Sequence, residues 1–311
     1  MSAKSEQLEQ ELEEAAEVCA SCGIAGVDNV KLKACDGGCD LVKYCSDECQ
    51  ENQREQHDEE CKKRKAELHD KQLFTQPDRS HRGECPICCL PLPVEFRKSS
   101  MMPCCSKWIC KGCDHANQKR EFFEGLEPRC AFCREPAAKS REEALKQIMR
   151  RVKKNDPVAM TQMGRIVSSE KDYDKALEYW TKAAELGDVE ALLYLGILYN
   201  DEMNYGVEKD EKKAVHYYEQ AAIVGHHGAN GYLAFHEERY GRFERAAKHF
   251  IIAANLGCNI SLKEIKRLFM GGKVSKEEYA AALRGHQAAV DATKSAERDE
   301  AEAFFAAAAT K

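Results

Sequence analysis

The 311-residue chain has no long apolar run, which excludes a membrane-spanning helix, because a span needs roughly 18 or more such residues. Residues 1–17 are acidic and lack the basic and apolar stretches of a secretory signal. A net charge of −6 and a pI of about 6.0 argue against a general nucleic-acid binder, which needs positive charge to neutralise phosphates. We therefore expect a protein of the cytoplasm and/or the nucleus, with neither a membrane nor a nucleic acid as partner.

Phosphate-binding glycine loops are also absent, since Gly271-Gly272 is a single turn before a helix cap. Two basic clusters, residues 62–65 and 150–154, interrupt the acidic balance. We interpret both as solvated helix faces between modules. A nuclear-import signal is the alternative for the first cluster.

Cysteine is nearly missing from the second half of the chain, where only Cys258 lies beyond residue 133. The other 16 of the 17 cysteines lie in two short blocks. These blocks are too small to fold on apolar burial alone and need a staple, meaning a disulfide or a bound metal ion that crosslinks the chain. In a reducing compartment that staple is a metal ion. A secreted disulfide framework is the alternative.

Eight Cys and His side chains in residues 18–61 have the spacing of zinc ligands. They form four pairs: Cys19 and Cys22, Cys35 and Cys39, Cys45 and Cys49, and His57 and Cys61. Zinc takes four ligands as a tetrahedron and favours thiolate and imidazole in structural sites. The i, i+4 spacing of the last two pairs places both members on one helix face. Cap residues at Ser46 and Asp47 and the absence of Gly and Pro predict a helix to Glu60.

These residues, with Tyr44 directly before Cys45, resemble a MYND-type zinc finger. The resemblance implies two interleaved sites. One zinc would be held by Cys19, Cys22, Cys45 and Cys49, and a second by Cys35, Cys39, His57 and Cys61. The chain departs from the family by one extra residue in Asp36-Gly37-Gly38, which glycines can absorb. Such closed sites fold a module without doing chemistry, and the resemblance implies docking of short proline-containing peptides.

A second set of eight cysteines lies in residues 84–136. Its pairs are Cys85 and Cys88, adjacent Cys104 and Cys105, Cys110 and Cys113, and Cys130 and Cys133. This block resembles a RING finger, another two-zinc module of interleaved sites. The resemblance implies a third zinc on Cys85, Cys88, Cys110 and Cys113, and a fourth on Cys104, Cys105, Cys130 and Cys133. The chain would therefore bind four zinc ions.

The second block departs from the RING pattern at Lys107, which stands where most of the family has a histidine ligand. A protonated ammonium group has no lone pair to give to a cation. Three alternatives follow: Cys104 and Cys105 both bind, which we favour, or His115 substitutes, or the fourth ion is lost. We expect Cys89, beside Cys88, to be a small half-buried thiol.

The RING resemblance also implies a surface for ubiquitin transfer. Ile87, Trp108 and Pro136 would form a shallow apolar patch for a ubiquitin-conjugating enzyme. Arg134, directly after the last ligand, would contact both that enzyme and its ubiquitin. Core packing of a very small domain is the alternative for Ile87, Trp108 and Phe132.

From about residue 155 a repeated pattern of alanine, leucine, tyrosine and glycine begins. It recurs at Lys175, Lys213 and Arg245, with spacings of 38 and 32 residues, and a glycine closes each copy. A period of this length with two helical patterns per unit predicts an α-solenoid. The closing glycines are natural left-handed helix caps, and we interpret the recurring aromatic residues as core.

The sequence pattern of these units resembles the Sel-one-like subclass of tetratricopeptide-type repeats, with three good repeats between about 155 and 257. Residues 260–270 and 275–287 look like a degenerate closing pair, in which Ser275 and Glu278 form a capping box. Solenoids offer a concave surface to partners. We therefore expect an unknown client protein on this half.

The predicted fold class is a multi-domain protein, in which two cross-braced zinc fingers precede an all-α solenoid of helix-turn-helix repeats. The predicted segments are an acidic helix or tail (1–17), a MYND-type finger (18–61), a charged linker (62–83), a RING-type finger (84–136), a basic helical linker (137–154), the solenoid (155–290) and a charged, alanine-rich tail (291–311).

The leading functional hypothesis is an interaction adaptor that acts as a RING-type ubiquitin-protein ligase by positioning rather than by covalent catalysis. A zinc-stabilised scaffold or transcriptional co-regulator without transfer activity is the alternative, and Lys107 favours it. The residues after 61 lack the β-rich catalytic domain of a MYND-linked lysine methyltransferase. Catalytic cysteine chemistry is disfavoured because every clustered cysteine already has a metal role.

Overall fold

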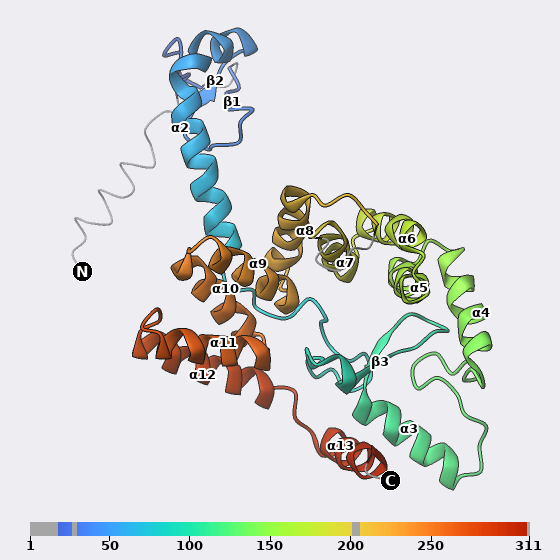
Figure 1. The fold of residues 1–311 in the computed structure, drawn as a ribbon. Coiled ribbons are helices and arrows are strands. Elements are labelled where there is room, and N and C mark those ends of the chain that lie inside the picture. The colour runs from blue at the N-terminus through green and yellow to red at the C-terminus, as the bar shows by residue number, and fades with distance from the viewer. Residues whose placement is uncertain (1–17, 27–29, 201–205, 310–311) are drawn as a thin grey trace, which may run out of the picture. The chain divides into compact units, whose positions relative to one another are not determined.

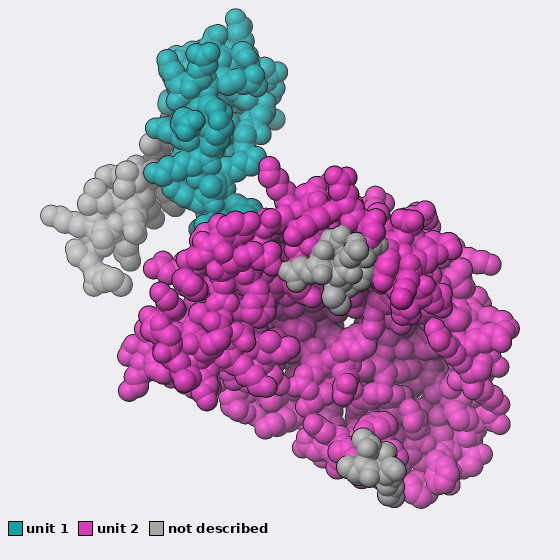
Figure 2. Space-filling view, in the orientation of Figure 1, with its two compact units in different colours: residues 1–73 teal, residues 74–311 magenta. Residues whose placement is uncertain are grey.

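The chain divides into two compact units after Leu73 (Figure 2). The computed structural model describes residues 18–26, 30–200 and 206–309, so the predicted acidic segment 1–17 lies outside the described residues. In the first unit a two-residue antiparallel hairpin, β1 (Lys33–Ala34) and β2 (Lys43–Tyr44), precedes the long helix α2 (Asp47–Leu73) (Figure 1). Each unit is described by itself below.

Helix α2 is longer than the sequence analysis predicts, because it continues past Glu60 through most of the expected linker. Residues 61–73 contain neither Gly nor Pro and are rich in the good helix formers Lys and Leu, so nothing in this stretch stops the helix. The basic cluster 62–65 lies on this helix. Lys62 is solvent-exposed and pairs with Asp58 one turn earlier at 2.6 Å. The cluster is therefore a solvated helix face, as predicted.

The second unit begins at Phe74, and the second cysteine block follows from residue 84. A 3₁₀ turn, η1 (Phe96–Lys98), leads into β3 (Ser99–Met101), which pairs antiparallel with β4 (Trp108–Cys110), and helix α3 (Lys111–Phe123) follows directly. Ser99 lies opposite Cys110 in this hairpin. The hairpin and α3 thus carry the Cys110 pair of ligands on consecutive elements.

The rest of the second unit is helical, as the fold class predicts. Its helices are α4 (Arg141–Val152), α5 (Pro157–Ser169), α6 (Tyr173–Glu185), α7 (Val189–Asn200), α8 (Glu211–Ile223), α9 (His227–Arg239), α10 (Phe243–Asn255), α11 (Asn259–Met270), α12 (Lys276–Asp291) and α13 (Ala296–Ala309). Figure 1 shows α5 to α12 following one another as stacked helix pairs. None of the helices in the described residues combines the length and the apolarity that crossing a bilayer requires.

Local sequence signals set the ends of the repeat helices. Asp172 and Asp210 each cap a helix by accepting a hydrogen bond from the backbone N–H three residues later. The glycine that closes each repeat adopts the left-handed conformation, with φ of 89°, 86° and 96° at Gly187, Gly225 and Gly257. The predicted caps are therefore confirmed. The capping box of Ser275 and Glu278 is also present at the start of α12.

Small residues on the first helix of a repeat admit an aromatic ring from the second. A Cβ atom at Gly164 would lie 2.4 Å from Nε1 of Trp180, and one at Gly196 would lie 2.4 Å from Cε1 of Tyr218. Both rings are buried. The recurring aromatic residues are therefore core, as predicted, and the two helices of a repeat interlock through paired small and large side chains.

Residues 74–83, here called the strap, pack on the solenoid at the Gly225 turn and on α10. The His81 amide donates to the Gly225 carbonyl at 3.2 Å, and the Gln76 side chain accepts from Asn255 at 3.0 Å. The Phe74 ring lies 4.8 Å from the His249 ring. The predicted charged linker therefore ends as an ordered part of the solenoid unit.

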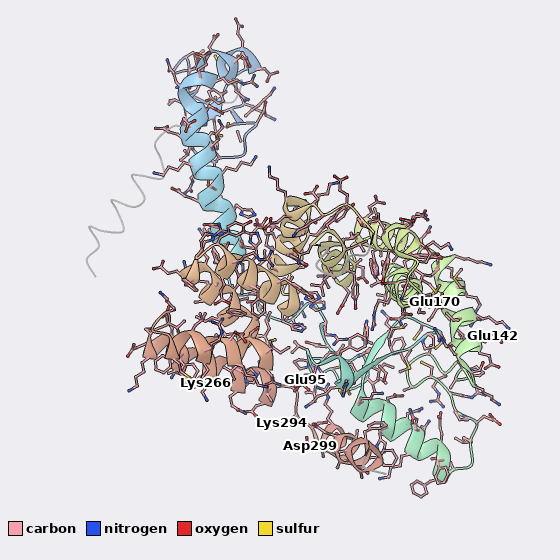
Figure 3. All side chains as sticks on the ribbon, in the orientation of Figure 1. Glu95, Glu142, Glu170, Lys266, Lys294 and Asp299 are labelled. Carbon is pink, nitrogen blue, oxygen red and sulfur yellow. The ribbon has the colours of Figure 1, made fainter. Side chains whose placement is uncertain are left out.

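The second cysteine block also packs on the solenoid instead of standing apart. Glu95, labelled in Figure 3, accepts a hydrogen bond from Asn259 at 2.6 Å. The Arg165 guanidinium of α5 lies 4.4 Å from the centre of the Phe96 ring, within cation–π range. The block and the repeats thus belong to one compact unit, residues 74–311.

We predict that Gly225→Ala loosens the strap. Alanine at a left-handed position costs about 1–2 kcal/mol. At Gly225 the new Cβ would also lie 2.5 Å from the Arg79 carbonyl oxygen, which adds about 1–3 kcal/mol of overpacking. Gly187→Ala is the matched control, because Gly187 has a similar φ of 89° and no atom within 4 Å of its Cβ position.

Urea unfolding measures the loss of stability in each variant, and amide hydrogen exchange of residues 76–83 measures the loosening of the strap. Gly225→Ala should lose more stability than Gly187→Ala and should exchange faster in the strap. Equal losses in the two variants would show that the strap does not depend on this contact.

Candidate metal centres

The first cluster joins Cys19 and Cys22 to Cys45 and Cys49. A tight turn presents the first pair, with the Cys19 amide donating to the Ile24 carbonyl at 2.8 Å. The Cys45 sulfur lies 3.5 Å from that of Cys22 and 3.6 Å from that of Cys49, which is in the first turn of α2. All four sulfurs come together as the interleaved pattern predicts.

The second cluster joins Cys35 and Cys39 to His57 and Cys61, and all four are buried. The Cys39 sulfur lies 3.1 Å from Nε2 of His57, and the Cys35 sulfur lies 3.8 Å from that of Cys61. The loop with the extra residue passes close to the Cys61 sulfur, and a Cβ at Gly37 would lie only 2.4 Å from it. Glycine is therefore required there, beyond the flexibility that the sequence analysis invoked.

The third cluster joins Cys85 and Cys88 to Cys110 and Cys113. The Cys88 and Cys110 sulfurs lie 3.8 Å apart, and the Cys110 sulfur accepts from the Cys113 amide at the start of α3. Cys89 has a positive φ of 56° and is exposed, with its sulfur outside the cluster. It is therefore more exposed than the predicted half-buried thiol.

The fourth cluster brings both adjacent cysteines to one place. The Cys104 sulfur lies 3.4 Å from that of Cys133, and the Cys105 sulfur lies 3.9 Å from that of Cys130. His115, the alternative ligand, is buried with its ring 4.7 Å from the Phe304 ring and is not in the cluster. Of the three alternatives for Lys107, the geometry supports the first.

The four clusters fit zinc in geometry and in donor type. Within each one, the ligand atoms all lie within 4.8 Å of one another. A Zn–S distance of about 2.3 Å places tetrahedral sulfurs about 3.8 Å apart, and the measured sulfur separations of 3.5 and 3.8 Å in the first and third clusters are close to this. Zinc here would crosslink distant segments rather than activate a water molecule, since each set already supplies four ligands.

The pKa values of the cysteines show why these clusters need a cation. A hydrogen bond from the Cys22 amide lowers the pKa of Cys19 to about 6, whereas the neighbouring Cys22 sulfur raises the pKa of Cys45 to about 12. In the third cluster a hydrogen bond with Cys110 lowers the pKa of Cys85 to about 4, and the same contact raises that of Cys110. One thiolate therefore suppresses the ionisation of the neighbouring thiols, and a divalent cation is needed for all four to lose their protons.

A fifth group of potential ligands, His81, His226 and His227, also lies within 4.8 Å. The His81 and His226 rings are stacked, with centroids 4.0 Å apart, so their nitrogen lone pairs do not converge on one point. Nδ1 of His226 accepts from the Gly228 and Ala229 amides, which leaves the proton on Nε2. Nε2 of His81 hydrogen-bonds the Glu190 carboxylate at 3.1 Å, whereas Nε2 of His226 lies 3.8 Å from that carboxylate, beyond hydrogen-bond distance.

Two of the residues predicted for ubiquitin transfer, Ile87 and Trp108, line different clefts. Ile87 is 41% exposed and lines a cleft with Asn117 of α3 and Arg134. Trp108 instead lies under the Arg82 guanidinium, 4.5 Å from the ring centre, and faces Val158 of α5. Ile87 and Trp108 thus line different clefts, and their joint docking patch stays a prediction.

Arg134 and Pro136 are also held by neighbouring groups. Arg134 has a φ of 62° and donates to Asn117 at 2.7 Å and to the buried Glu121 carboxylate at 2.9 Å. The Pro136 carbonyl accepts from Gln147 of α4 at 3.1 Å. Phe132 is 42% exposed, so neither it nor Ile87 is the core residue that the alternative prediction expected.

Comparisons with known proteins agree with this picture in two parts of the chain. Residues 19–61 match the MYND finger family, and residues 157–188, 189–226 and 243–258 match the Sel1 repeat. The chain therefore carries a zinc-binding MYND finger followed by a Sel1-type helical solenoid. Modules of both kinds generally mediate protein–protein interactions, and this is the coarse function that the matches support.

Individual relatives are more distant. A sel1-like repeat-containing protein of Acanthamoeba polyphaga mimivirus is 28% identical over 109 residues, which cover 34% of this chain and 19% of the relative. The chain therefore matches about a fifth of that relative's length. A Sel1 repeat protein of Oxalobacter formigenes has a TM-score of 0.43 and 26% identity over 58% of this chain and 72% of that chain.

A further solved structure, a protective antigen of uropathogenic Escherichia coli strains with an SLR fold, has a TM-score of 0.43 and 21% identity. It covers 56% of this chain and 37% of that chain.

We predict four zinc ions per chain, counted by native mass spectrometry under reducing conditions. Cys104→Ser and Cys105→Ser should each lose one ion, because each removes a ligand of the fourth cluster. Cys89→Ser is the matched control and should keep four, since its sulfur lies outside the clusters. Retention of four ions by Cys105→Ser, or three in the unchanged chain, would contradict the assignment of the fourth site.

We also predict that acid weakens the strap. Burial lowers the pKa of His226 to about 4 and that of His227 to about 3, whereas an unfolded imidazole takes up a proton near pH 6.5. The contribution of these two neutral histidines to the free energy of unfolding is therefore fully present above pH 6.5. It falls as the pH drops toward 4, and the loss is about 2 kcal/mol per histidine at pH 5.

His227→Gln should reduce this loss by about 1–2 kcal/mol between pH 6.5 and 5, and His216→Gln, an exposed histidine of α8, should not. Urea unfolding of zinc-loaded protein measures the difference, with zinc content checked at each pH because thiolates also take up protons in acid. An unchanged pH dependence in His227→Gln would contradict the assignment.

Proposed function

We propose that the chain is a zinc-dependent interaction adaptor whose second cysteine block, residues 84–136, acts as a RING-type ubiquitin-protein ligase. The observation that carries the proposal is the interleaving of the third and fourth clusters. Cys85 and Cys88 pair with Cys110 and Cys113, while Cys104 and Cys105, which lie between these pairs in the sequence, join Cys130 and Cys133. Two interleaved four-ligand sites around one short helix are the arrangement expected of a RING finger.

A docking site for a ubiquitin-conjugating enzyme is supported by the cleft beside α3. Its lining includes Ile87, Asn117, Ala131 and Arg134, which places the exposed Ile87 beside a polar rim. In this proposal the enzyme binds over Ile87, and the finger holds the thioester-linked ubiquitin in one orientation. The rate gain comes from positioning, and the protein forms no covalent intermediate.

A scaffold without transfer activity is the second candidate, and the surroundings of Arg134 favour it. The guanidinium is held by Asn117 and by the buried Glu121, so it is not free to reach ubiquitin without breaking an ion pair. Ser295 and Glu297, which flank the start of α13, also line the Ile87 cleft. Lys107 in place of the usual histidine also favours a scaffold without transfer activity.

The other modules supply binding partners in this proposal. The MYND finger would dock short proline-containing peptides. The solenoid would hold a client protein on surfaces away from the strap, which already covers the glycine turn at Gly225. A protein with these roles would act in the cytoplasm and/or the nucleus.

We predict zinc-dependent ubiquitin-chain formation when the full chain is mixed with ubiquitin, an activating enzyme and a broad panel of conjugating enzymes. Ile87→Ala should reduce chain formation about tenfold or more, because it removes the apolar contact at the cleft. Phe123→Ala, which changes an exposed residue at the far end of α3, is the control and should not. Arg134→Ala should also lower activity.

Zinc content and thermal unfolding are measured in parallel, because removing Arg134 leaves the Glu121 carboxylate without its ion pair. No chains with any conjugating enzyme, from protein that holds four zinc ions, would reject the ligase and leave the scaffold.

A further inference from the structure

The C-terminal helix α13 packs directly on the loop that carries two ligands of the third cluster. Gly112 lies between Cys110 and Cys113, and a Cβ there would lie 2.8 Å from the Arg298 amide nitrogen and 2.9 Å from the Glu297 carbonyl carbon. Only a hydrogen atom fits between the ligand loop and the backbone of α13. The first turn of this helix therefore rests on the metal-binding loop, although it lies more than 180 residues away in sequence.

Arg298 extends from that first turn into the cluster. Its Nη2 atom donates to the Cys88 sulfur at 3.4 Å and to the Leu90 carbonyl at 3.3 Å. Its Nη1 atom donates to the carbonyls of Pro91 and Thr293, at 2.8 and 2.7 Å. Only 9% of the residue is exposed. The guanidinium thus joins the turn after Cys88 to the start of α13.

The charge of a zinc–thiolate site explains what this buried cation does. Four thiolates and one Zn²⁺ carry a net charge of −2, which is costly to bury without a nearby positive group. An arginine stays protonated at any physiological pH and offers a planar set of donors. A donor to a ligand sulfur disperses part of the negative charge and fixes the position of that ligand, and partners of this kind commonly change metal affinity 10–100-fold.

Contacts along the whole helix hold Arg298 in this place. Ala301 is fully buried, and the Phe304 ring lies 4.7 Å from the His115 ring of α3. Lys119 of α3 pairs with Glu300 at 2.5 Å, and Lys98 pairs with Glu302 at 3.2 Å. Arg298 is therefore positioned by a continuous interface rather than by one flexible contact.

We propose that Arg298 is an outer-shell residue of the third metal site, so that zinc retention by the second finger and docking of α13 stabilise each other. The proposal rests on zinc binding by Cys85, Cys88, Cys110 and Cys113, and it does not depend on ligase activity. Coupling between two binding events is reciprocal. Loss of zinc loosens α13, and undocking of α13 speeds the loss of zinc.

The first test follows zinc release from the full chain to a chelator in excess. Arg298→Gln should start with four ions and release one of them roughly 10-fold faster than the unchanged chain, within the range for outer-shell partners. Arg298→Lys keeps the charge and should restore part of the slow release. Arg284→Gln, an exposed arginine of α12, is the matched control and should release zinc normally.

Cys88→Ser identifies the site, because it should lack the release phase that Arg298→Gln accelerates. If Cys88→Ser still holds four ions, the third site itself is wrong. If it holds three and Arg298→Gln releases zinc at the normal rate, the site stands and the coupling is wrong. The two failures are therefore distinguishable.

The second test undocks α13 without altering a ligand or a charge. Gly112→Ala places a Cβ against the backbone of α13, at a helical position that otherwise accepts alanine. Hydrogen exchange in residues 296–307 and zinc release should both become faster. Gly231→Ala, a helical glycine of α9 with no atom within 4 Å of its Cβ position, should change neither. Faster exchange with an unchanged release rate would overturn the proposal.

Discussion

Repulsion between clustered thiolates is the constraint on which the first 133 residues depend. Each of the four clusters holds its ligand atoms within 4.8 Å of one another, and the Cys22 sulfur raises the pKa of Cys45 to about 12, so such neighbours do not all ionise unaided. A divalent cation removes this repulsion and crosslinks the segments at the same time. Because neither finger has a large apolar core, the metal sites have to supply most of the stability of both.

The two fingers are nevertheless integrated in different ways. The MYND finger and α2 belong to a unit of their own. The second finger shares its unit with the solenoid, through the Arg165 contact with Phe96 and the Asn259 contact with Glu95. Its metal sites therefore stabilise more than the finger, since the strap on one side and α13 on the other are fixed against it. A protein built this way would couple metal occupancy to the arrangement of its helical repeats.

Local spacing explains what could be predicted from the sequence. Ligand pairs such as Cys45 and Cys49, the cap at Gly187 and the capping box at Ser275 all depend on residues a few positions apart, so their geometry follows from the order of the residues. The clustering of Cys104 with Cys105 could also be expected, because Lys107 offers no lone pair. The end of α2 was missed because residues 61–73 carry no stop signal.

Contacts between distant segments could not be predicted in this way. The approach of His81 to Gly225, and that of Arg298 to Cys88, leave no period or motif in the sequence. A resemblance transfers a residue such as Trp108 by its order along the chain, whereas its surroundings, here the Arg82 guanidinium 4.5 Å from the ring centre, are set by the fold. The spacing on α13 of Arg298, Ala301 and Phe305, whose ring lies 6.0 Å from the His115 ring, was the available signal for its packing.

Hydrogen exchange with and without bound metal tests this account most directly. After exhaustive chelation in reducing buffer, residues 30–46 and 84–136 should lose protection, while the central repeat helices α8 to α10 keep theirs. Restoring zinc should restore both fingers. Unchanged protection in the two fingers after complete metal removal would contradict the claim that bound cations hold them together.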